Sequence, residues 1–208
     1  MTTGRFISLE GIDGAGKSAQ IGRLADWLRT TGRDVTTCRD PGSTPAGDAV
    51  RAILLDRHDL HLAATAEMFL YMAARAQLVA EVVGPSLGRG GWVVSDRYLL
   101  SNVVYQGHAG GLDPEVIRRV GGVATGGLMP DLVLLLDVDL ETSRRRLDRP
   151  LDKLESRGDE FRARLRAGYL AEAARQPDRI VVIDATASID EVTNRIRRAV
   201  TARHPELA

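Results

Sequence analysis

Cysteine, net charge and long apolar runs are scarce or missing in this sequence. Its one cysteine, Cys38, can form no internal disulfide and cannot supply a zinc site of several thiolates. The 28 basic and 28 acidic residues cancel, so bulk charge gives no reason to expect a nucleic-acid or membrane partner. Residues 1–10 lack a stretch of signal-peptide length, and no apolar run approaches the ~20 residues of a membrane span. We therefore expect a soluble, cytoplasmic protein.

Lysine is also rare. Among the 28 basic residues only Lys17 and Lys153 are lysines, and the others are arginines. The simplest explanation of this bias is a genome that favours arginine codons. A lysine that is present despite this preference for arginine still indicates a position that needs a compact point charge, which arginine does not provide.

The chain is long enough for one domain. It has 208 residues, 44% of them hydrophobic and 27% charged, which is a composition that can bury a core. We find no internal repeat, low-complexity tract or polar linker, and we expect a single domain over residues 1–208.

Short apolar runs alternate with helix-patterned segments along the whole chain. Strands are predicted at 6–9, 34–38, 92–95, 132–138 and 180–183, and helices at 18–28, 46–55, 65–83 and 189–200. The run at 132–138 is nearly unbroken, as in a strand covered on both faces. This alternation predicts an α/β fold with a five-stranded parallel sheet and helices on both faces. Ligands bind such sheets beyond the carboxyl ends of the strands.

Residues 11–18 match the G-x-x-x-x-G-K-[ST] pattern of a phosphate-binding P-loop, between a predicted strand and a predicted helix. Glycines let successive backbone N–H groups converge on an anion, and the helix that follows adds its own free N–H groups. Lys17 would approach the β- and γ-phosphates of a nucleotide, and the Ser18 hydroxyl could ligate Mg²⁺. The predicted phosphate-binding residues are Gly11, Ile12, Asp13, Gly14, Ala15, Gly16, Lys17 and Ser18.

Two classes of P-loop or kinase protein are excluded. A switch GTPase needs an Asn-Lys-x-Asp segment, and neither asparagine of this chain is followed by lysine. A protein kinase uses a different glycine-rich loop and an Asp-Phe-Gly motif, which does not occur here. The chain is thus predicted to be a small P-loop phosphotransferase or hydrolase. Asp13 within the loop makes sense if its carboxylate accepts a hydrogen bond from a sugar hydroxyl of a second ligand.

Asp96 and Arg97 end the third predicted strand. The carboxylate is well placed to hold Mg²⁺ through water, and the arginine to grip a second phosphate group. Tyr71 and Arg75 share one helix face and could contact a nucleobase. Spacing alone favours the simpler reading of a core tyrosine beside a surface arginine.

The segment 144–166 carries nine basic and five acidic residues. It reads either as two solvated helices joined by a loop or as a lid that brings arginine to a transferring phosphoryl group.

Taken together, these motifs resemble the thymidylate kinase (dTMP kinase) family, of the bacterial kind, over nearly the whole chain. The resemblance rests on the P-loop, Asp-Pro-Gly-Ser-Thr at 40–44, Ala-Ala-Arg-Ala-Gln at 73–77, Asp-Arg-Tyr at 96–98, Tyr-Gln-Gly at 105–107, Pro-Asp at 130–131, Leu-Asp-Lys-Leu-Glu at 151–155 and Asp-Ala at 184–185. It implies a nucleoside monophosphate kinase-like P-loop fold. It also implies phosphoryl transfer from Mg²⁺·ATP to dTMP, giving dTDP and ADP, by a homodimer.

The resemblance also implies residue roles, and it reverses the spacing-only reading of Tyr71 and Arg75. Arg97 would hold the dTMP phosphate. Arg75 and Asn102 would contact the thymine edge, while Tyr71 would stack on the ring. The remaining expected dTMP-binding residues are Tyr105 against the sugar C2′, Asp13 at the 3′-hydroxyl, Arg51 near the phosphate end and Gln106 in the same loop as Tyr105.

The sequence departs from the family pattern at several positions. Tyr71 replaces the usual phenylalanine, Ser43 a common glycine, and Lys153 the usual lid arginine. The eukaryotic kind carries an arginine at the position of Gly14. Here the transition-state arginine is expected from a lid at about 148–158, with Arg149 the first candidate and Arg157 the second.

Two other functions stay open at this point. One is another nucleoside or nucleotide kinase. The other is a nucleotide-binding module that has lost turnover and acts through a partner protein.

Overall fold

The computed structural model describes residues 4–147 and 158–207. Within these ranges lies one five-stranded parallel sheet in the order β2-β3-β1-β4-β5. The strands are β1 (Arg5–Glu10), β2 (Val35–Arg39), β3 (Trp92–Asp96), β4 (Leu132–Asp137) and β5 (Ile180–Asp184). All five predicted strands are present, each within one or two residues of its predicted bounds. The fold class is therefore confirmed.

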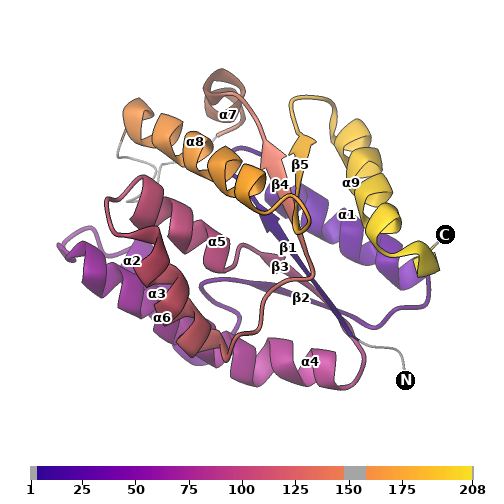
Figure 1. Cartoon of the computed structure of the whole chain (residues 1–208), viewed down its shortest axis with the longest axis horizontal. Coiled ribbons are helices and arrows are strands. Elements are labelled where there is room, and N and C mark those ends of the chain that lie inside the picture. Colours follow the sequence, from indigo (N-terminus) through magenta and orange to yellow (C-terminus); the bar gives the residue numbers. More distant parts are fainter. Residues whose placement is uncertain (1–3, 148–157, 208) are drawn as a thin grey trace.

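Helices cover both faces of the sheet (Figure 1). α1 (Lys17–Thr30) and α9 (Ile189–Arg203) pack together on one face. The opposite face carries α3 (Ala64–Leu78), α4 (Gly84–Gly88), α5 (Leu99–Asn102), α6 (Pro114–Thr125) and α8 (Asp159–Arg175). The described part of the chain also contains α2 (Pro45–Leu55), α7 (Leu140–Arg146), π-helical turns at Val79–Val83 and Val103–His108, and a 3₁₀ turn at Pro205–Leu207.

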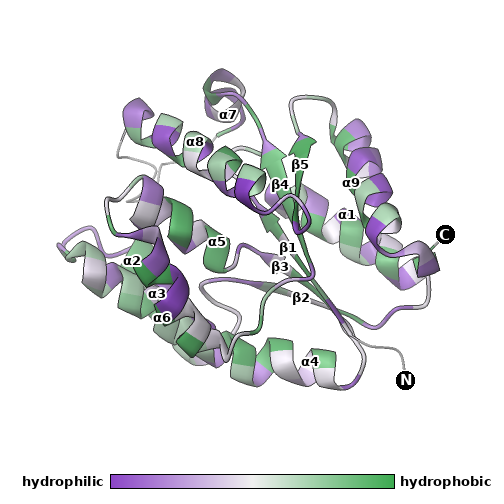
Figure 2. Cartoon of the chain, in the orientation of Figure 1, coloured by the Kyte–Doolittle hydropathy of each residue, from purple (hydrophilic) through white to green (hydrophobic). Residues whose placement is uncertain are grey.

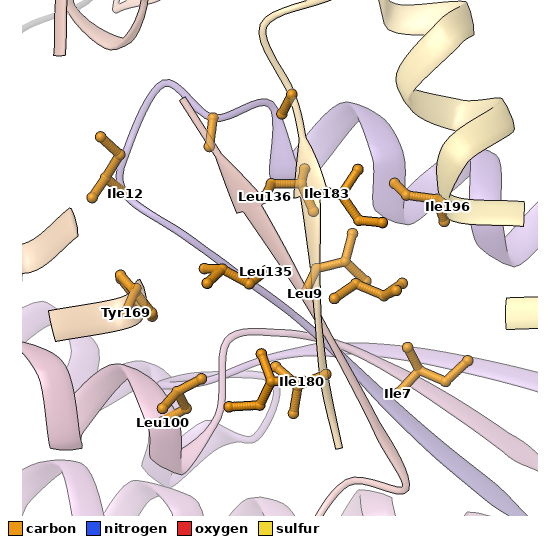
Figure 3. Packing of buried hydrophobic residues seen from close by; sticks show 14 of the residues in the cluster. Ile7, Leu9, Ile12, Leu100, Leu135, Leu136, Tyr169, Ile180, Ile183 and Ile196 are labelled. Carbon is orange, nitrogen blue, oxygen red and sulfur yellow. The ribbon is translucent and has the colours of Figure 1, made fainter. Parts of the chain in front are cut away.

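The core lies on both sides of the sheet because the central strands are apolar on both faces (Figure 2). Ile196 of α9 lies beside Leu136 and Ile183, while Leu100 and Tyr169 lie on the other side of the strands (Figure 3). Every residue of β4 except the terminal Asp137 is buried, as its unbroken apolar sequence predicts. Because the strands are packed on both faces, their carboxyl ends are held in place, and the site is built on these ends.

Several helical segments lie outside the four helices predicted from the sequence. They are α6, α7, α8 and the helical stretch of α5 with the following π-helical turn, which carries residues 101–107. Of these, α7 and α8 overlap the segment 144–166, for which two helices were one of the two readings. The predicted helix at 65–83 is resolved into α3 and a π-helical turn, with α4 continuing beyond it.

No helix among the described residues is both long and apolar enough to cross a bilayer.

Candidate active site

The loop at residues 11–18 joins β1 to α1 and turns on three glycines with positive φ. Gly11, Gly14 and Gly16 have φ of 134°, 80° and 92°. A Cβ at Gly11 would collide with the Leu136 carbonyl oxygen, and one at Gly14 with the carbonyl oxygen of Ser143 in α7. Neighbouring backbone therefore leaves no room for a side chain at Gly11 or Gly14, whereas at Gly16 the positive φ alone favours glycine.

Lys17 lies buried at the start of α1. Its Nζ donates to the carbonyl oxygens of Gly11 and Ile12 at 2.9 and 3.1 Å, and lies 3.6 Å from Oδ1 of Asp13. Burial and the nearby Arg97 guanidinium lower the pKa of the Lys17 ammonium, although Asp13 partly offsets them. Ser18 is exposed beside it. The loop thus presents one positive charge and one open hydroxyl.

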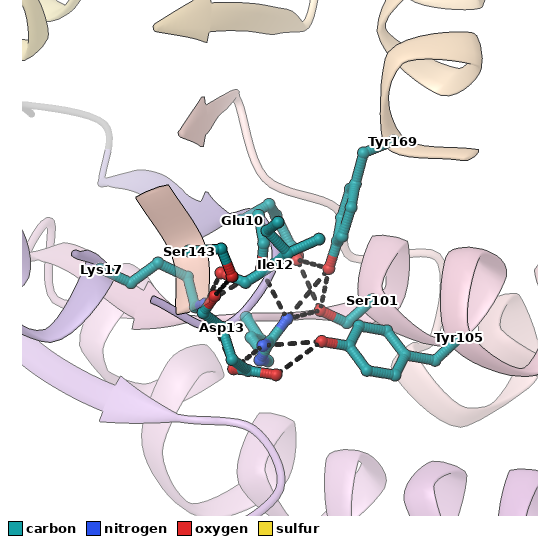
Figure 4. A network of polar contacts seen from close by, with 10 residues as sticks. Glu10, Ile12, Asp13, Lys17, Ser101, Tyr105, Ser143 and Tyr169 are labelled. Carbon is teal, nitrogen blue, oxygen red and sulfur yellow. Dashed lines mark hydrogen bonds and ion pairs between the residues drawn. The ribbon is translucent and has the colours of Figure 1, made fainter. Parts of the chain in front are cut away.

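Arg97 forms the centre of a polar network. Figure 4 labels four of its partners, Asp13, Ser101, Tyr105 and Tyr169. Arg97 has φ of 67°, a backbone conformation that costs energy for a residue with a side chain. Its Nη2 donates to Asp13 Oδ1 at 2.5 Å and to the Tyr105 hydroxyl at 3.0 Å, and that hydroxyl donates to Asp13 Oδ2 at 3.0 Å. Burial alone would raise the pKa of Asp13, but Arg97 and Lys17 outweigh it and hold the pKa well below its usual range. The family resemblance implies one shared ligand for these three residues, and the structure brings them into direct contact.

Arg97 is held in turn by residues that were not predicted as site residues from the sequence. Arg97 Nη1 donates to the hydroxyls of Ser101 and Tyr169 at 3.1 and 3.0 Å. Both hydroxyls also contact Glu10 Oε2, at 2.6 and 3.3 Å, and Glu10 Oε1 accepts from the Tyr98 N–H. Burial raises the pKa of Glu10 to about 7, despite the opposing effects of Ser101 and Arg97. An acid next to a P-loop on a buried strand was the available signal for Glu10.

Arg75 is the centre of a second polar network, deeper in the site. It is 1% exposed and pairs through Nε with Oδ2 of the fully buried Asp40 at 2.5 Å. Its Nη2 donates to Oδ1 of Asn102, whose Nδ2 donates to Gln106 Oε1 at 2.8 Å. Burial raises the pKa of Asp40 even though Arg75 pulls it down. These side chains form a continuous hydrogen-bonded edge.

One cavity of about 710 Å³ connects the two networks to the loop. Tyr71 and Arg51 line it, and Arg51 donates to the Pro41 carbonyl oxygen at 3.1 Å. Asp96 also lines it, with an Oδ1 that is buried and has no hydrogen-bond partner in the described structure. The cavity lining includes, of the predicted site residues, Asp13, Gly14, Ala15, Gly16, Lys17, Ser18, Arg51, Tyr71, Arg75, Asp96, Arg97, Asn102, Tyr105 and Gln106.

Other predicted residues lie outside this set. Gly11 and Ile12 belong to the loop without lining the cavity; their carbonyls hold Lys17 instead. Arg149 and Arg157, with nearly all of the expected lid, fall outside the described residues.

Arg146 was not predicted as a site residue, yet it lines the cavity. Its guanidinium donates to the carbonyl oxygens of residues 185, 186 and 187, and residues 185 and 187 line the cavity with it. It ends α7 and faces the loop after β5, so only the folded chain brings these groups together.

This parallel sheet, with a phosphate-binding loop after its central strand and a polar cavity at the strand ends, defines a P-loop NTPase-type α/β protein. The family model described as thymidylate kinase matches residues 9–196. A thymidylate kinase from Leifsonia xyli subsp. xyli is 47% identical over 197 residues, which cover 93% of this chain and 93% of that protein. One from Oleidesulfovibrio alaskensis is 44% identical over 204 residues, covering 94% and 96%. The chain belongs to the thymidylate kinase family and is an enzyme of that family.

A solved structure agrees with this assignment. The crystal structure of thymidylate kinase from Ehrlichia chaffeensis matches with a TM-score of 0.78 at 27% identity, over 95% of this chain and 99% of that one. The likeness therefore extends to the whole architecture.

Proposed function

We propose that this enzyme transfers the γ-phosphoryl group of Mg²⁺·ATP to dTMP and produces dTDP and ADP for dTTP synthesis. The observation that carries the proposal is the continuous cavity of about 710 Å³, which holds the phosphate-binding loop at one end and the Arg97 and Arg75 networks at the other. Such an arrangement suits two nucleotides placed end to end with their phosphates facing each other.

The acceptor occupies the end formed by the two networks. Arg97 takes the dTMP phosphate, and Asp13 meets the 3′-hydroxyl. Arg75 and Asn102 donate hydrogen bonds to the thymine edge, with Gln106 beside them and Tyr71 on the ring face. Two further contacts complete the set: Tyr105 packs against C2′, and Arg51 supports the phosphate end. The ion pairs among these residues support the roles, because they hold the donors in place before dTMP arrives.

The donor occupies the loop end. Backbone N–H groups of residues 11–18 cradle its phosphates, and Lys17 neutralises the β- and γ-oxygens. Arg146 and the 185–188 segment border the space for the adenine base. The residues present also fit Mg²⁺: the exposed Ser18 hydroxyl and the unpartnered, buried Asp96 Oδ1 are oxygen ligands of the kind this ion takes beside phosphates. When bound, Mg²⁺ would neutralise charge on the donor phosphates.

The chemistry needs no general base, because a phosphate dianion is already a nucleophile. What the protein must supply is alignment of two anions and cancellation of their repulsion. Lys17 and Arg97 supply fixed positive charge from opposite ends of the cavity. We assign the further transition-state cation to Arg149, with Arg157 second, in a lid at about residues 148–158.

The functional unit is proposed to be a cytoplasmic homodimer. Two large apolar side chains on neighbouring helices support a dimer: Phe69 of α3 is 55% exposed and Val123 of α6 is 85% exposed. Sedimentation of the wild type and of V123D tests this, and a monomeric wild type would contradict it.

A substrate panel tests the function. Purified enzyme is given Mg²⁺·ATP with dTMP, dUMP, dCMP, dAMP or thymidine, and ADP release is measured. We expect dTMP to be turned over best. Preference for another acceptor would indicate a different nucleotide kinase, and tight ATP binding without dTMP-dependent ADP release would indicate a binding module without turnover.

A further inference from the structure

A second cavity lies behind the active site, on the sheet face covered by α5, α6 and α8. Its volume is about 270 Å³. Its walls come from β1, β4 and the start of α5, closed by Gly122 of α6 and by the end of α8. Leu100 and Ile180, which are part of the wall, are close together in Figure 3. Because a dry cavity of about 150 Å³ can already hold a benzene ring, this one has room for a substituted ring.

The hydroxyl of Ser8 is a polar group in the otherwise largely apolar lining of this cavity. Along β1 the side chains of Phe6, Ser8 and Glu10 alternate onto this face, between apolar neighbours. Ser8 is 0% exposed, and its hydroxyl has no hydrogen-bond partner in the described parts of the chain. Leaving a buried hydroxyl unmatched costs about 1–3 kcal/mol, so a bound group that matches it would gain affinity.

Charges at the cavity are of both signs and largely paired with each other. Arg118 donates to Glu172 Oε1, and Glu172 also contacts His108 at 2.8 Å. Arg118 and Glu172 both line the cavity, with the exposed Arg179 at its edge. A neutral ligand avoids disturbing these pairs, and the apolar walls favour a ring or a compact aliphatic body.

Glu10 connects this cavity to the active site. It lines the cavity, and its carboxylate holds the Ser101 and Tyr169 hydroxyls that receive hydrogen bonds from Arg97 (Figure 4). A molecule packed against Glu10 would therefore restrict the groups that orient Arg97. When one ligand restricts such a network, a second ligand that needs the same order binds at a lower entropic cost.

We propose that this cavity is a second small-molecule site for a neutral, ring-sized compound with one hydroxyl-type group, and that its occupancy strengthens dTMP binding through Glu10 and Arg97. The coupling, though not the site, rests on the proposed function. Phenol is a suitable probe for the site, and toluene has nearly the same shape without the hydroxyl.

The site is tested by ligand-observed NMR titration of the nucleotide-free protein with each probe. We expect saturable phenol binding with Kd on the order of 1 mM, a scale that a ligand of this size can reach. G122L should weaken it about tenfold by filling the cavity, since a Cβ at Gly122 meets only open space and leucine suits a helix better than glycine. G22L is the matched control, because Gly22 is an equally open position on α1, across the sheet. Unsaturable binding, or equal binding by G122L and wild type, would overturn the site.

A second variant keeps this test decisive if G122L folds poorly. S8A should remove the preference for phenol over toluene while leaving toluene binding in place, because only the hydroxyl contact is lost. An unchanged preference in S8A would refute the role of Ser8.

The coupling is tested by calorimetric titration of dTMP with and without saturating phenol. We expect dTMP affinity to rise about threefold in wild type, ATP affinity to stay unchanged, and the effect to vanish in E10Q. Unchanged dTMP affinity in wild type would overturn the coupling. A protein that binds no dTMP under any condition would instead contradict the proposed function, and the phenol titration would still decide the cavity.

Discussion

The two ends of the large cavity are built in different ways. At the acceptor end, side chains are paired with side chains: Arg97 with Asp13, and Arg75 with Asp40. At the donor end, Lys17 bonds mainly to backbone carbonyl oxygens, and the Ser18 hydroxyl stands open. Asp13 touches both, because it lies 3.6 Å from Lys17 as well as beside Arg97.

Under the proposed function, this difference matches what each end must recognise. A phosphate chain is common to many nucleotides, and a loop shaped by its own backbone is enough to hold it. One base and one sugar must be chosen among several at the other end, and buried hydrogen-bonding groups give that choice because a wrong ligand leaves them unmatched. Substitutions at the two ends should therefore have separable effects.

Removing Asp40 should destabilise the whole protein. D40N leaves the buried Arg75 guanidinium without its counter-ion, which costs about 3–5 kcal/mol of unfolding free energy. Denaturant unfolding measures this. The matched control is D48N, because the Arg39–Asp48 pair is exposed and should matter far less. Equal losses in the two variants would contradict the contrast.

The Glu10 carboxyl should make stability depend on pH. Burial raises its pKa to about 7 from an ordinary value of 4.5, so the folded chain binds this proton more tightly than the unfolded chain does. The resulting stabilisation is complete below pH ~4 and is lost as pH rises to about 7, and amounts to about 3 kcal/mol. Unfolding free energies across this range measure it. E10Q should lack this component, whereas E115Q, at an exposed position, should keep it.

Loss of Lys17 should act on turnover and not on acceptor choice. K17A removes the fixed charge at the donor phosphates, and kcat should fall at least about a hundredfold. Steady-state ADP release measures it, with R23A on the exposed face of α1 as the control. Turnover near the wild-type rate in K17A would remove the proposed mechanism.

Loss of Arg97 should act on the acceptor. R97A removes a charged donor to the dTMP phosphate, and KM for dTMP should rise about thirtyfold while KM for ATP changes little. Parallel KM measurements decide this. Equal increases for both substrates would argue against the place assigned to Arg97.

The hydroxyl of Tyr105 should have the smallest effect. Y105F removes the bonds to Arg97 and Asp13 but keeps the ring, so KM for dTMP should rise only about fivefold. Discrimination between dTMP and its ribose counterpart should persist in Y105F and weaken in Y105A. If Y105F alone lost that discrimination, the hydroxyl and not the ring would select the sugar.

The parts of this molecule that depend on local pattern were predictable. β4 is a continuous apolar run, and the loop at 11–18 is a fixed spacing of glycines and lysine between a strand and a helix. α6 also carried local signals that were not used: Asp113 caps its N-terminus, Pro114 follows, and Gly126 ends it with φ of 60°.

The supporting residues could not be predicted in the same way. Tyr169 reaches Glu10 across 159 positions of sequence, and Arg146 meets residues that come about 40 positions later. No spacing rule marks such pairs, because packing of α7 and α8 over the strand ends creates them. The burial of Arg75 likewise became visible only in the folded chain, because spacing alone had favoured a surface position for this residue.

The carbonyl of Ser143 above Gly14 has an evolutionary consequence. Any residue larger than glycine at position 14 would strike the backbone of α7, and the φ of 80° there already disfavours one. A single substitution therefore cannot introduce here the arginine that the family resemblance describes for the eukaryotic kind. α7 would have to shift at the same time, and a point mutation in the loop alone does not provide that shift.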